Sequence, residues 1–286
     1  MIVVTDAAGI ERAALALSGA EALGGVLVPT MGALHDGHAA LIHRAAELAG
    51  RDERGAGCVV SIFVNPAQFN DPADYERYPR TLDADLRLCE AAGASVVFAP
   101  PASVVYPPGM VVEQPLLPGV ATTPGLEDAH RPGHFAGVCR VVLRLFRLLR
   151  PDAAVFGEKD WQQLQVVSAM TESLALPIRI EPHATIREAD GLALSSRNRF
   201  LSADERRRAV ALARALCEAA AAREPADAED RMRRVLTRAG VEAEYAAVRD
   251  AATLDAPQAA RRACRALIAV RLGGTRLIDN APWVPA

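Results

Sequence analysis

Two histidines lie in the loop PTMGALHDGH (29–38), between a short apolar run and a helical pattern. His35 falls in the loop and His38 in the first turn of the helix, which Asp36 can cap. A helix start presents free N–H groups and the positive end of the helix dipole, and imidazoles there can follow the charge of a reacting phosphoryl group. The pattern therefore favours nucleotide phosphate binding. The alternatives are a zinc pair, for which the nearby sequence supplies no further ligands, and capping histidines without chemistry.

Lys159 is the only lysine among 32 basic residues, the other 31 being arginines. It follows Gly157 at the end of an apolar run, where the backbone can approach a ligand closely, and its compact ammonium suits a shifting phosphate charge. A solvated surface lysine is the alternative. The residues around Lys159 exclude the P-loop, the protein-kinase lysine motif and the class A β-lactamase motif.

Two amides, Asn65 and Gln68, follow the next apolar run in SIFVNPAQF (61–69). Each amide offers both a donor and an acceptor, which suits a hydroxy acid. Taken alone, the segment would be a plain polar loop.

Further along the chain, hydroxyls precede a guanidinium in Ser195-Ser196-Arg197, a combination that fits phosphate. A turn beside a helix is the alternative. His130 and His134 bracket Pro132 and Gly133, which argues against one shared helical face and against zinc. We expect Arg131 and His134 to line a cleft, and His43 and His183 to be structural.

Apolar runs that alternate with helical patterns must position these residues. The expected strands are 26–29, 58–64, 95–100, 153–156 and 178–180, all buried, and the expected helices are 39–48, 82–92, 138–149 and 162–174. This alternation predicts an α/β domain over residues 1–185, a Rossmann-like parallel sheet with helices on both faces. Ligands then bind where the strands end, after Pro29, Val64 and Phe156.

A different pattern begins near residue 186. Ser202 and Glu205 form a capping box before a long helix, and a second helix ends near Gly240. Strands are expected at 242–248, 266–272 and 275–279, the last two joined by Gly273-Gly274 as a hairpin. Residues 186–286 are therefore predicted to be a smaller α+β domain, and we expect it to act as a lid.

Composition narrows the partners. The net charge is −3 and no large basic block occurs, so neither nucleic acid nor a membrane is expected to bind. Arginines at 140, 144 and 147 make 138–149 an amphipathic surface helix, unsuited to span a membrane. Five scattered cysteines indicate reduced, mostly buried thiols. The N-terminus does not resemble a signal peptide, so we expect a cytoplasmic protein.

Ordered matches along nearly the whole chain resemble the pantothenate synthetase (pantoate–β-alanine ligase) family of the His-x-Gly-His nucleotidyltransferase and class I aminoacyl-tRNA synthetase superfamily. They are PTMGALHDGH (29–38), SIFVNPAQF (61–69), YPRTLDAD (78–85), RPGHFAGV (131–138), FGEKDWQQL (156–164) and READGLALSSRNRFLS (187–202). The resemblance implies that pantoate attacks the α-phosphate of ATP to give pantoyl adenylate and pyrophosphate. The amine of β-alanine then displaces AMP. It also implies a homodimer.

The resemblance assigns roles residue by residue. Those implied to bind ATP are Met31, Gly32, Ala33, Leu34, His35, Asp36, Gly37, His38, Gly157, Glu158, Lys159, Asp160, Ile186, Leu194, Ser195, Ser196 and Arg197. Those implied to be catalytic are His35, His38, Lys159 and Arg197. Pantoate would contact Asn65, Gln68 and Gln163, β-alanine would contact Gln68, and the backbone of Ile186 would contact the adenine.

A magnesium ion, as the resemblance implies, would take Asp85 as its ligand. A solvated helix face carrying Asp83 and Asp85 is the equally weighted alternative. Three positions depart from the pattern of the relatives: Arg197 replaces a lysine common in the superfamily, Leu194 replaces Met, and Trp161 replaces Tyr. A packing role tolerates the last change.

Three rival functions share parts of this pattern. A nucleotidyltransferase acting on a phosphorylated acceptor is the nearest, but it would need more cationic groups than the amides of Asn65, Gln68 and Gln163 supply. A tRNA-charging enzyme would need an anticodon-reading extension. A nucleotide sensor has no use for paired imidazoles at a reacting phosphate.

Overall fold

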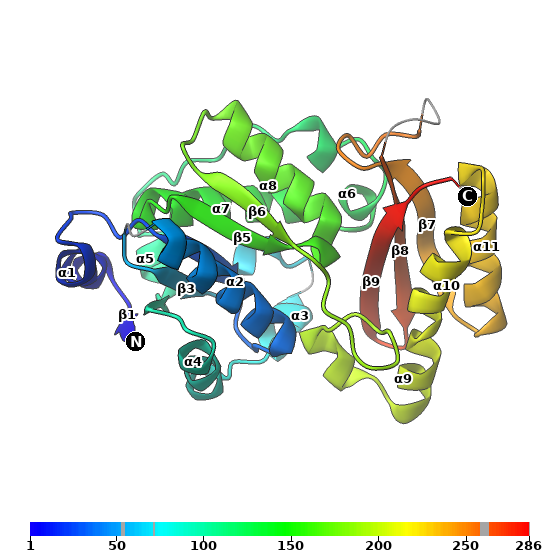
Figure 1. The fold of residues 1–286 in the computed structure, drawn as a ribbon, viewed down its shortest axis with the longest axis horizontal. Coiled ribbons are helices and arrows are strands. Elements are labelled where there is room, and N and C mark those ends of the chain that lie inside the picture. Colours follow the sequence, from blue (N-terminus) through cyan, green and yellow to red (C-terminus); the bar gives the residue numbers. More distant parts are fainter. Residues whose placement is uncertain (53–54, 71, 258–262, 286) are drawn as a thin grey trace.

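The computed structural model describes residues 1–52, 55–70, 72–257 and 263–285, and two β-sheets organise them (Figure 1). The larger sheet is parallel and has the order β1-β4-β3-β2-β5-β6. Its strands are β1 Ile2–Val4, β2 Val26–Thr30, β3 Cys58–Ile62, β4 Val96–Phe98, β5 Ala153–Gly157 and β6 Arg179–His183. The strand order reverses between β2 and β5, the position at which sheets of this kind bind ligands.

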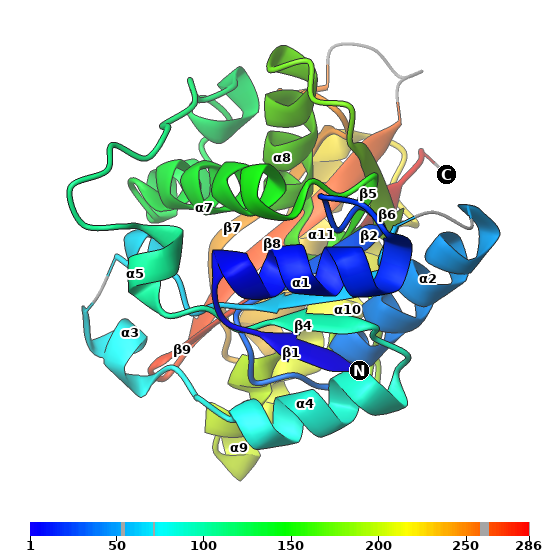
Figure 2. The same cartoon turned by 90° about the vertical axis from the view of Figure 1, so that its left-hand side faces the viewer.

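Helices cover both faces of this sheet because alternate strand residues point to opposite sides. Leu27 and Val59 pack with α1 (Ala7–Ser18), α7 (His134–Leu149) and α8 (Trp161–Ser173). Val28 and Val60 pack with α2 (Asp36–Asp52) and α4 (Leu82–Ala91) on the other side. Figure 2 shows α1 and α7 above the sheet and α4 below it. The predicted α/β fold is confirmed.

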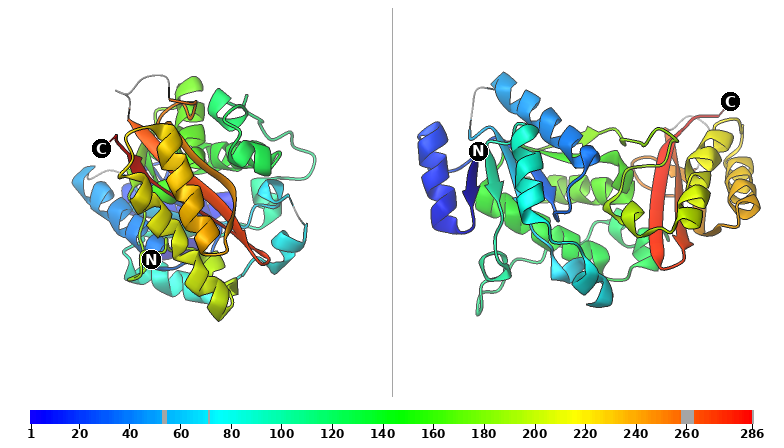
Figure 3. Two further views of the ribbon diagram at one scale, coloured as in Figure 1. Left: turned by 90° about the vertical axis from the view of Figure 1, so that its right-hand side faces the viewer. Right: turned by 90° about the horizontal axis from the view of Figure 1, so that it is seen from below.

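The smaller sheet is antiparallel, in the order β7-β8-β9. Its strands are β7 Glu242–Asp250, β8 Cys264–Leu272 and β9 Thr275–Trp283, and Gly273 and Gly274 join the last two as predicted. One face of the sheet packs on α10 (Ala211–Ala219) and α11 (Pro225–Arg238). The other face packs on residues 1–185, here called the larger part of the chain, and residues 186–286 are called the smaller part. The sheet is therefore buried on both sides (Figure 3). The predicted α+β unit is confirmed.

Short connecting helices complete the described chain. They are η1 Pro66–Gln68, α3 Pro72–Arg77, α5 Ala102–Val105, η2 Gly119–Ala121, α6 Glu127–His130, η3 Glu158–Asp160, η4 Ser196–Phe200 and α9 Ala203–Ala209. The capping box of Ser202 and Glu205 is present at the start of α9. The long helix predicted after it is wrong, because a break at Val210 divides it into α9 and α10.

Three further expectations need correction. Strand β1 was not predicted, since three residues give too short a pattern. β6 exists but is not a buried strand, because it forms the sheet edge and its side chains are half-buried or exposed. Helix α7 is amphipathic as expected, but its arginine face is only partly exposed. Arg144 is half-buried and its Nε donates to Val105 O at 3.0 Å, whereas Arg147 is exposed and pairs with Glu113 at 3.4 Å.

Two further features of the fold concern the cysteines and the helices. None of the five cysteines, all within the described ranges, forms a disulfide; Cys58, Cys89, Cys139 and Cys264 are buried as expected, whereas Cys217 is exposed. Among the residues that the structure describes, no helix combines the length and the apolarity that a membrane span requires.

Candidate active site

A cavity of about 230 Å³ lies at the carboxyl ends of β2 and β5, where the strand order reverses. The predicted ATP-binding residues that line it are Met31, His35, Gly37, His38, Gly157, Lys159, Asp160, Ile186, Leu194, Ser195, Ser196 and Arg197. Gln68 and Gln163 also line it. Residues from four separate segments of the sequence therefore meet around one space.

The segment from Thr30 to His38, here called the histidine turn, ends in a reciprocal cap of α2. His35 Nδ1 accepts from Gly37 N–H at 3.1 Å, and His38 Nδ1 accepts from His35 N–H at 3.3 Å. This is the logic of a capping box, with imidazoles in place of hydroxyl and carboxylate. The helix begins at Asp36, so the prediction that Asp36 caps it is wrong, and His35 holds that place.

The caps decide which ring nitrogen carries the proton. A neutral imidazole whose Nδ1 accepts a hydrogen bond must be protonated on Nε2. Burial, the charge of Lys159 and other neighbours lower the pKa of His35 to about 4, and burial, His35 and Lys159 lower that of His38 to about 3. Near neutral pH both rings are therefore neutral Nε2–H donors on the cavity wall. Capping and chemistry are compatible here, because the cap occupies the other nitrogen.

The histidine turn needs small residues. A Cβ on Gly37 would meet the His35 ring at 2.9 Å. Gly32 has φ +84° and Ala33 has φ 52°, a region that favours glycine. Gly32, Ala33, Leu34 and Asp36 do not line the cavity but shape the turn that does.

Asp85 supports this turn from α4. Its carboxylate accepts from Ala33 N–H at 3.0 Å, from Leu34 N–H at 2.8 Å and from Thr81 Oγ1 at 3.1 Å. Asp85 is 2% exposed, so the expectation of a solvated face is wrong for it, whereas Asp83 is exposed. No cluster of three or more possible metal ligands occurs within residues 1–52, 55–70, 72–257 and 263–285.

The residues Glu158–Asp160, here called the lysine turn, link β5 to α8. Lys159 and Asp160 line the cavity. Glu158 does not. It points to the smaller sheet, where its carboxylate pairs with Arg265 at 2.7 Å. The turn therefore faces the cavity on one side and the smaller part of the chain on the other.

Neighbouring protein groups hold Gln68 in place. Asn65 Nδ2 donates to Gln68 Oε1 at 3.1 Å and to Gly137 O at 3.1 Å, and Asn65 Oδ1 accepts from Tyr106 at 2.9 Å. Asn65 is 1% exposed and does not line the cavity. Asn65 lies beside Gln68, as predicted. Its amide, however, is hydrogen-bonded to other protein groups and does not face the cavity.

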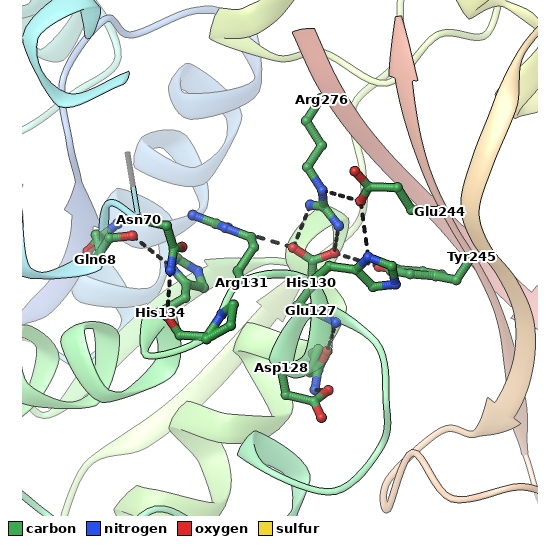
Figure 4. Close-up of polar contacts among 12 residues, drawn as sticks. Gln68, Asn70, Glu127, Asp128, His130, Arg131, His134, Glu244, Tyr245 and Arg276 are labelled. Atoms are coloured by element: carbon green, nitrogen blue, oxygen red, sulfur yellow. Dashed lines mark hydrogen bonds and ion pairs between the residues drawn. The ribbon is translucent and has the colours of Figure 1, made fainter. Parts of the chain in front are cut away.

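His134 contacts the backbone of Gln68 (Figure 4). Its Nδ1 is 2.9 Å from Gln68 O, and since a carbonyl only accepts, this nitrogen is the donor. Burial and the charge of Arg131 lower the pKa of His134 to about 3, so the ring is neutral. Arg131 and His134 line a small cavity together with Lys159 and Gln163, as expected of a cleft.

The loop 184–197 covers the cavity from the side of the smaller part. Leu194 N–H donates to Ile186 O at 2.9 Å. The backbone of Ile186, which is predicted to contact the adenine, therefore already accepts one hydrogen bond within the loop. Ser195 Oγ caps η4 by accepting from Arg197 N–H at 3.3 Å. Ser196 and Arg197 also line the cavity.

Sequence reasoning missed a charged cluster between the two parts. Glu127 accepts from Arg276 at 2.6 and 2.7 Å and from Tyr245 Oη at 2.7 Å (Figure 4). Burial alone would raise the pKa of Glu127, but the hydrogen bonds and charge of Arg276 outweigh it and lower that pKa to about 2. Glu244 joins Arg276 at 2.7 Å and His130 at 3.7 Å. These residues are far apart in sequence, and no motif links them.

The fold and the cavity define the class: an α/β protein whose strand ends bring imidazoles, a lysine, an arginine and amides around a space suited to a polar, anionic ligand. The family model described as pantoate-beta-alanine ligase matches residues 3–282, and the chain belongs to that family.

Individual relatives agree. The chain is 49% identical over 269 residues to a pantothenate synthetase from a Nocardioides species, covering 90% of this chain and 78% of that one. It is 48% identical over 261 residues to one from Cereibacter sphaeroides, covering 90% of each. The crystal structure of pantothenate synthetase from Thermus thermophilus has a TM-score of 0.87 at 38% identity, covering all of both chains. A pantoate-beta-alanine ligase from Francisella tularensis, complexed with "Beta-gamma ATP" and β-alanine, has a TM-score of 0.78 at 30% identity, covering 99% and 97%.

Proposed function

We propose that this chain joins pantoate to β-alanine at the expense of ATP and releases AMP and pyrophosphate. The observation that carries the proposal is the convergence of His35, His38, Lys159 and Arg197 on one cavity beside Gln68 and Gln163. Family membership supplies the reaction, and the cavity offers cationic and neutral donors for phosphate beside amides for a hydroxy acid.

The reaction has two steps in this proposal. A pantoate carboxylate oxygen bonds to the α-phosphorus of ATP, the bond from that phosphorus to the bridging oxygen breaks, and pyrophosphate leaves. The β-alanine nitrogen then bonds to the pantoyl carbonyl carbon, AMP departs with its oxygen, and the amine loses a proton. Neither step needs a covalent bond to the protein, so catalysis rests on positioning and charge stabilisation.

Each side chain has a role in these steps. Nε2–H of His35 and of His38 would donate to the phosphate oxygens as charge builds up on the leaving pyrophosphate. Lys159 and Arg197 would balance the triphosphate charge. Gln68 and Gln163 would orient pantoate, with Gln68 next to the incoming β-alanine. Asn65 would act on pantoate through Gln68, which it holds. The backbone of Ile186 would contact the adenine.

Magnesium would enter bound to the ATP phosphates, and such ions usually take one or two protein carboxylates. Asp85 is the predicted ligand, and its three hydrogen bonds inside the fold leave little room for this role. The ion would lower the cost of separating pyrophosphate from the α-phosphate.

We also propose a cytoplasmic homodimer in which residues 186–286 close over the substrates. Closure would carry Ser195, Ser196 and Arg197 toward the phosphates. Small-angle scattering with and without ATP and pantoate tests it: a smaller radius of gyration supports closure, and identical profiles count against it.

One assay tests the function. The protein is incubated with ATP, magnesium and pantoate, with and without β-alanine, and pyrophosphate, AMP and pantothenate are measured. Ligation predicts pyrophosphate with pantoate alone and AMP only with β-alanine. Transfer of a nucleoside monophosphate onto a phosphorylated acceptor, without an amine, would instead indicate the nucleotidyltransferase alternative.

A further inference from the structure

The lysine turn takes its main support from a residue on the smaller sheet that lies 121 positions after Lys159. Asn280 Nδ2 donates to Glu158 O at 2.9 Å and to Lys159 O at 2.8 Å, and Asn280 is 3% exposed. We propose that Asn280 is a positioning residue for Lys159: it fixes the backbone from which the ammonium reaches the cavity. The inference rests on the proposed role of Lys159 at the ATP phosphates.

The amide of Asn280 can adopt only one orientation. Its Oδ1 accepts from Arg265 Nε at 2.6 Å, and Arg265 Nη2 donates to Glu158 Oε2 at 2.7 Å. The same guanidinium lies 3.5 Å from the ring centroid of Trp161, which begins α8. Because Arg265 is a donor only, it excludes a flipped amide, and Nδ2 must face the two carbonyls.

The backbone of Asn280 connects this support to a second cavity segment. Asn280 O accepts from Arg187 Nη2 at 3.2 Å, and the carboxylate of Asp279 holds Arg187 at 2.7 and 2.9 Å. Arg187 directly follows Ile186, which lies on the cavity wall. Residues 279 and 280 of β9 thus hold the lysine turn and the proposed adenine contact in a fixed relation.

The lysine turn has little support of its own. It is a three-residue 3-10 helix, and no side chain caps its start. Such short helices have poor hydrogen-bond geometry. Lysine also has a long flexible stem, so a displaced backbone moves the volume that the ammonium can reach. Misplacement by about 1 Å can lower a rate roughly 100-fold.

Asn280→Asp keeps the size of the side chain and replaces the donor with an oxygen that repels both carbonyls. Single-turnover pyrophosphate release in ATP and pantoate should slow about 10- to 100-fold. The rate of amide formation from added pantoyl adenylate and β-alanine should stay within about twofold of the wild-type rate, because no triphosphate takes part in that step. Asn280→Ala removes the donor without repulsion and should show the same split to a smaller extent, which keeps the test open if Asn280→Asp does not fold.

Trp283→Phe is the matched control. Trp283 lies on the same strand, is 3% exposed and donates to Ala219 O at 2.8 Å, away from the lysine turn. It should lower Tm without selectively slowing the first step. The proposal is wrong, and Asn280 is merely structural, if the Asn280 variants slow both steps equally. The same conclusion follows if their rates for the two steps equal those of Trp283→Phe when the Tm values are the same.

A spectroscopic readout separates this proposal from the one on which it rests. Because the chain has one lysine, labelling lysine with 13C at the ε carbon gives a single side-chain signal. We expect ATP to shift that signal in the wild-type protein, and the shift to be lost or halved in Asn280→Asp. An unchanged shift and rate in Asn280→Asp would overturn the positioning role. Normal pyrophosphate release in Lys159→Gln would instead overturn the proposed role of Lys159 itself.

Discussion

The histidine turn and the lysine turn face one cavity, but different parts of the chain hold them in place. Asp85 and the reciprocal imidazole caps support the histidine turn, and all of these belong to the larger sheet and its helices. The lysine turn depends on Asn280 and Arg265 of the smaller sheet. Half of the proposed phosphate site is thus built by the larger part alone, and the other half requires both. The smaller part therefore helps to build the site, whether or not it also closes as a lid.

The largest effects should come from the side chains that face the cavity. His38→Ala removes an Nε2–H donor and Lys159→Ala removes a charge, and each should slow adenylate formation about 100- to 10,000-fold. Rapid-quench measurement of pyrophosphate release checks this. Both variants should keep the wild-type circular dichroism spectrum. Pyrophosphate release at the wild-type rate in either variant would show that the side chain, and the turn that carries it, does not contribute to the phosphate site.

Asp85→Asn tests how the histidine turn is supported. It would bring either an N–H group or a weaker acceptor against the N–H groups of Ala33 and Leu34. Loss of roughly 1.4 to 2 kcal/mol of support should slow pyrophosphate release about 10- to 30-fold. Asp83→Asn, on the exposed side of the same helix, is the control and should match the wild type.

Magnesium separates the two roles considered for Asp85. If it supports the turn, a tenfold rise in magnesium leaves the Asp85→Asn rate unchanged. Recovery of the rate at high magnesium would show that Asp85 acts as a metal ligand.

The buried imidazoles should also make stability depend on pH. An unfolded His38 binds a proton near pH 6.5, whereas the folded one does so only near pH 3, so acidification between these values favours unfolding. The free energy of unfolding should fall by up to about 1.4 kcal/mol per pH unit from this residue. Urea titrations from pH 7 to 5 measure it. His38→Gln should flatten the slope, and His43→Gln, exposed on the same helix, should not. Equal slopes in all three proteins would contradict the buried, neutral state of His38.

The sequence predicts what local patterns encode and misses what the tertiary structure assembles. Strand–helix alternation was enough for the α/β sheet, and motif strings were enough to find most of the polar residues of the cavity wall. The support of each turn was not predictable in this way. Asn280 and Glu127 lie outside every motif, and the partners that each contacts across the two parts are 118 to 149 residues away.

Exposure was equally difficult to predict from a single sequence. Asp83 and Asp85 are both acidic residues near a helix start, yet one is exposed and the other buried under the histidine turn. Asn65 illustrates the same limit, because an amide that suits a ligand also suits the backbone of a neighbouring helix. Only the packing of α4 and α7 against these loops decides between the two uses.

The most direct test of a shared phosphate site uses the single lysine. Lys159 is acetylated with limiting acetic anhydride, and its peptide is quantified by mass spectrometry without nucleotide, with AMP and with ATP. If both turns hold one triphosphate, ATP slows acetylation at least about tenfold, AMP does not, and His38→Ala raises the ATP concentration needed for half-protection. Acetylation of Lys159 at the same rate with saturating ATP as without it would contradict the site described here.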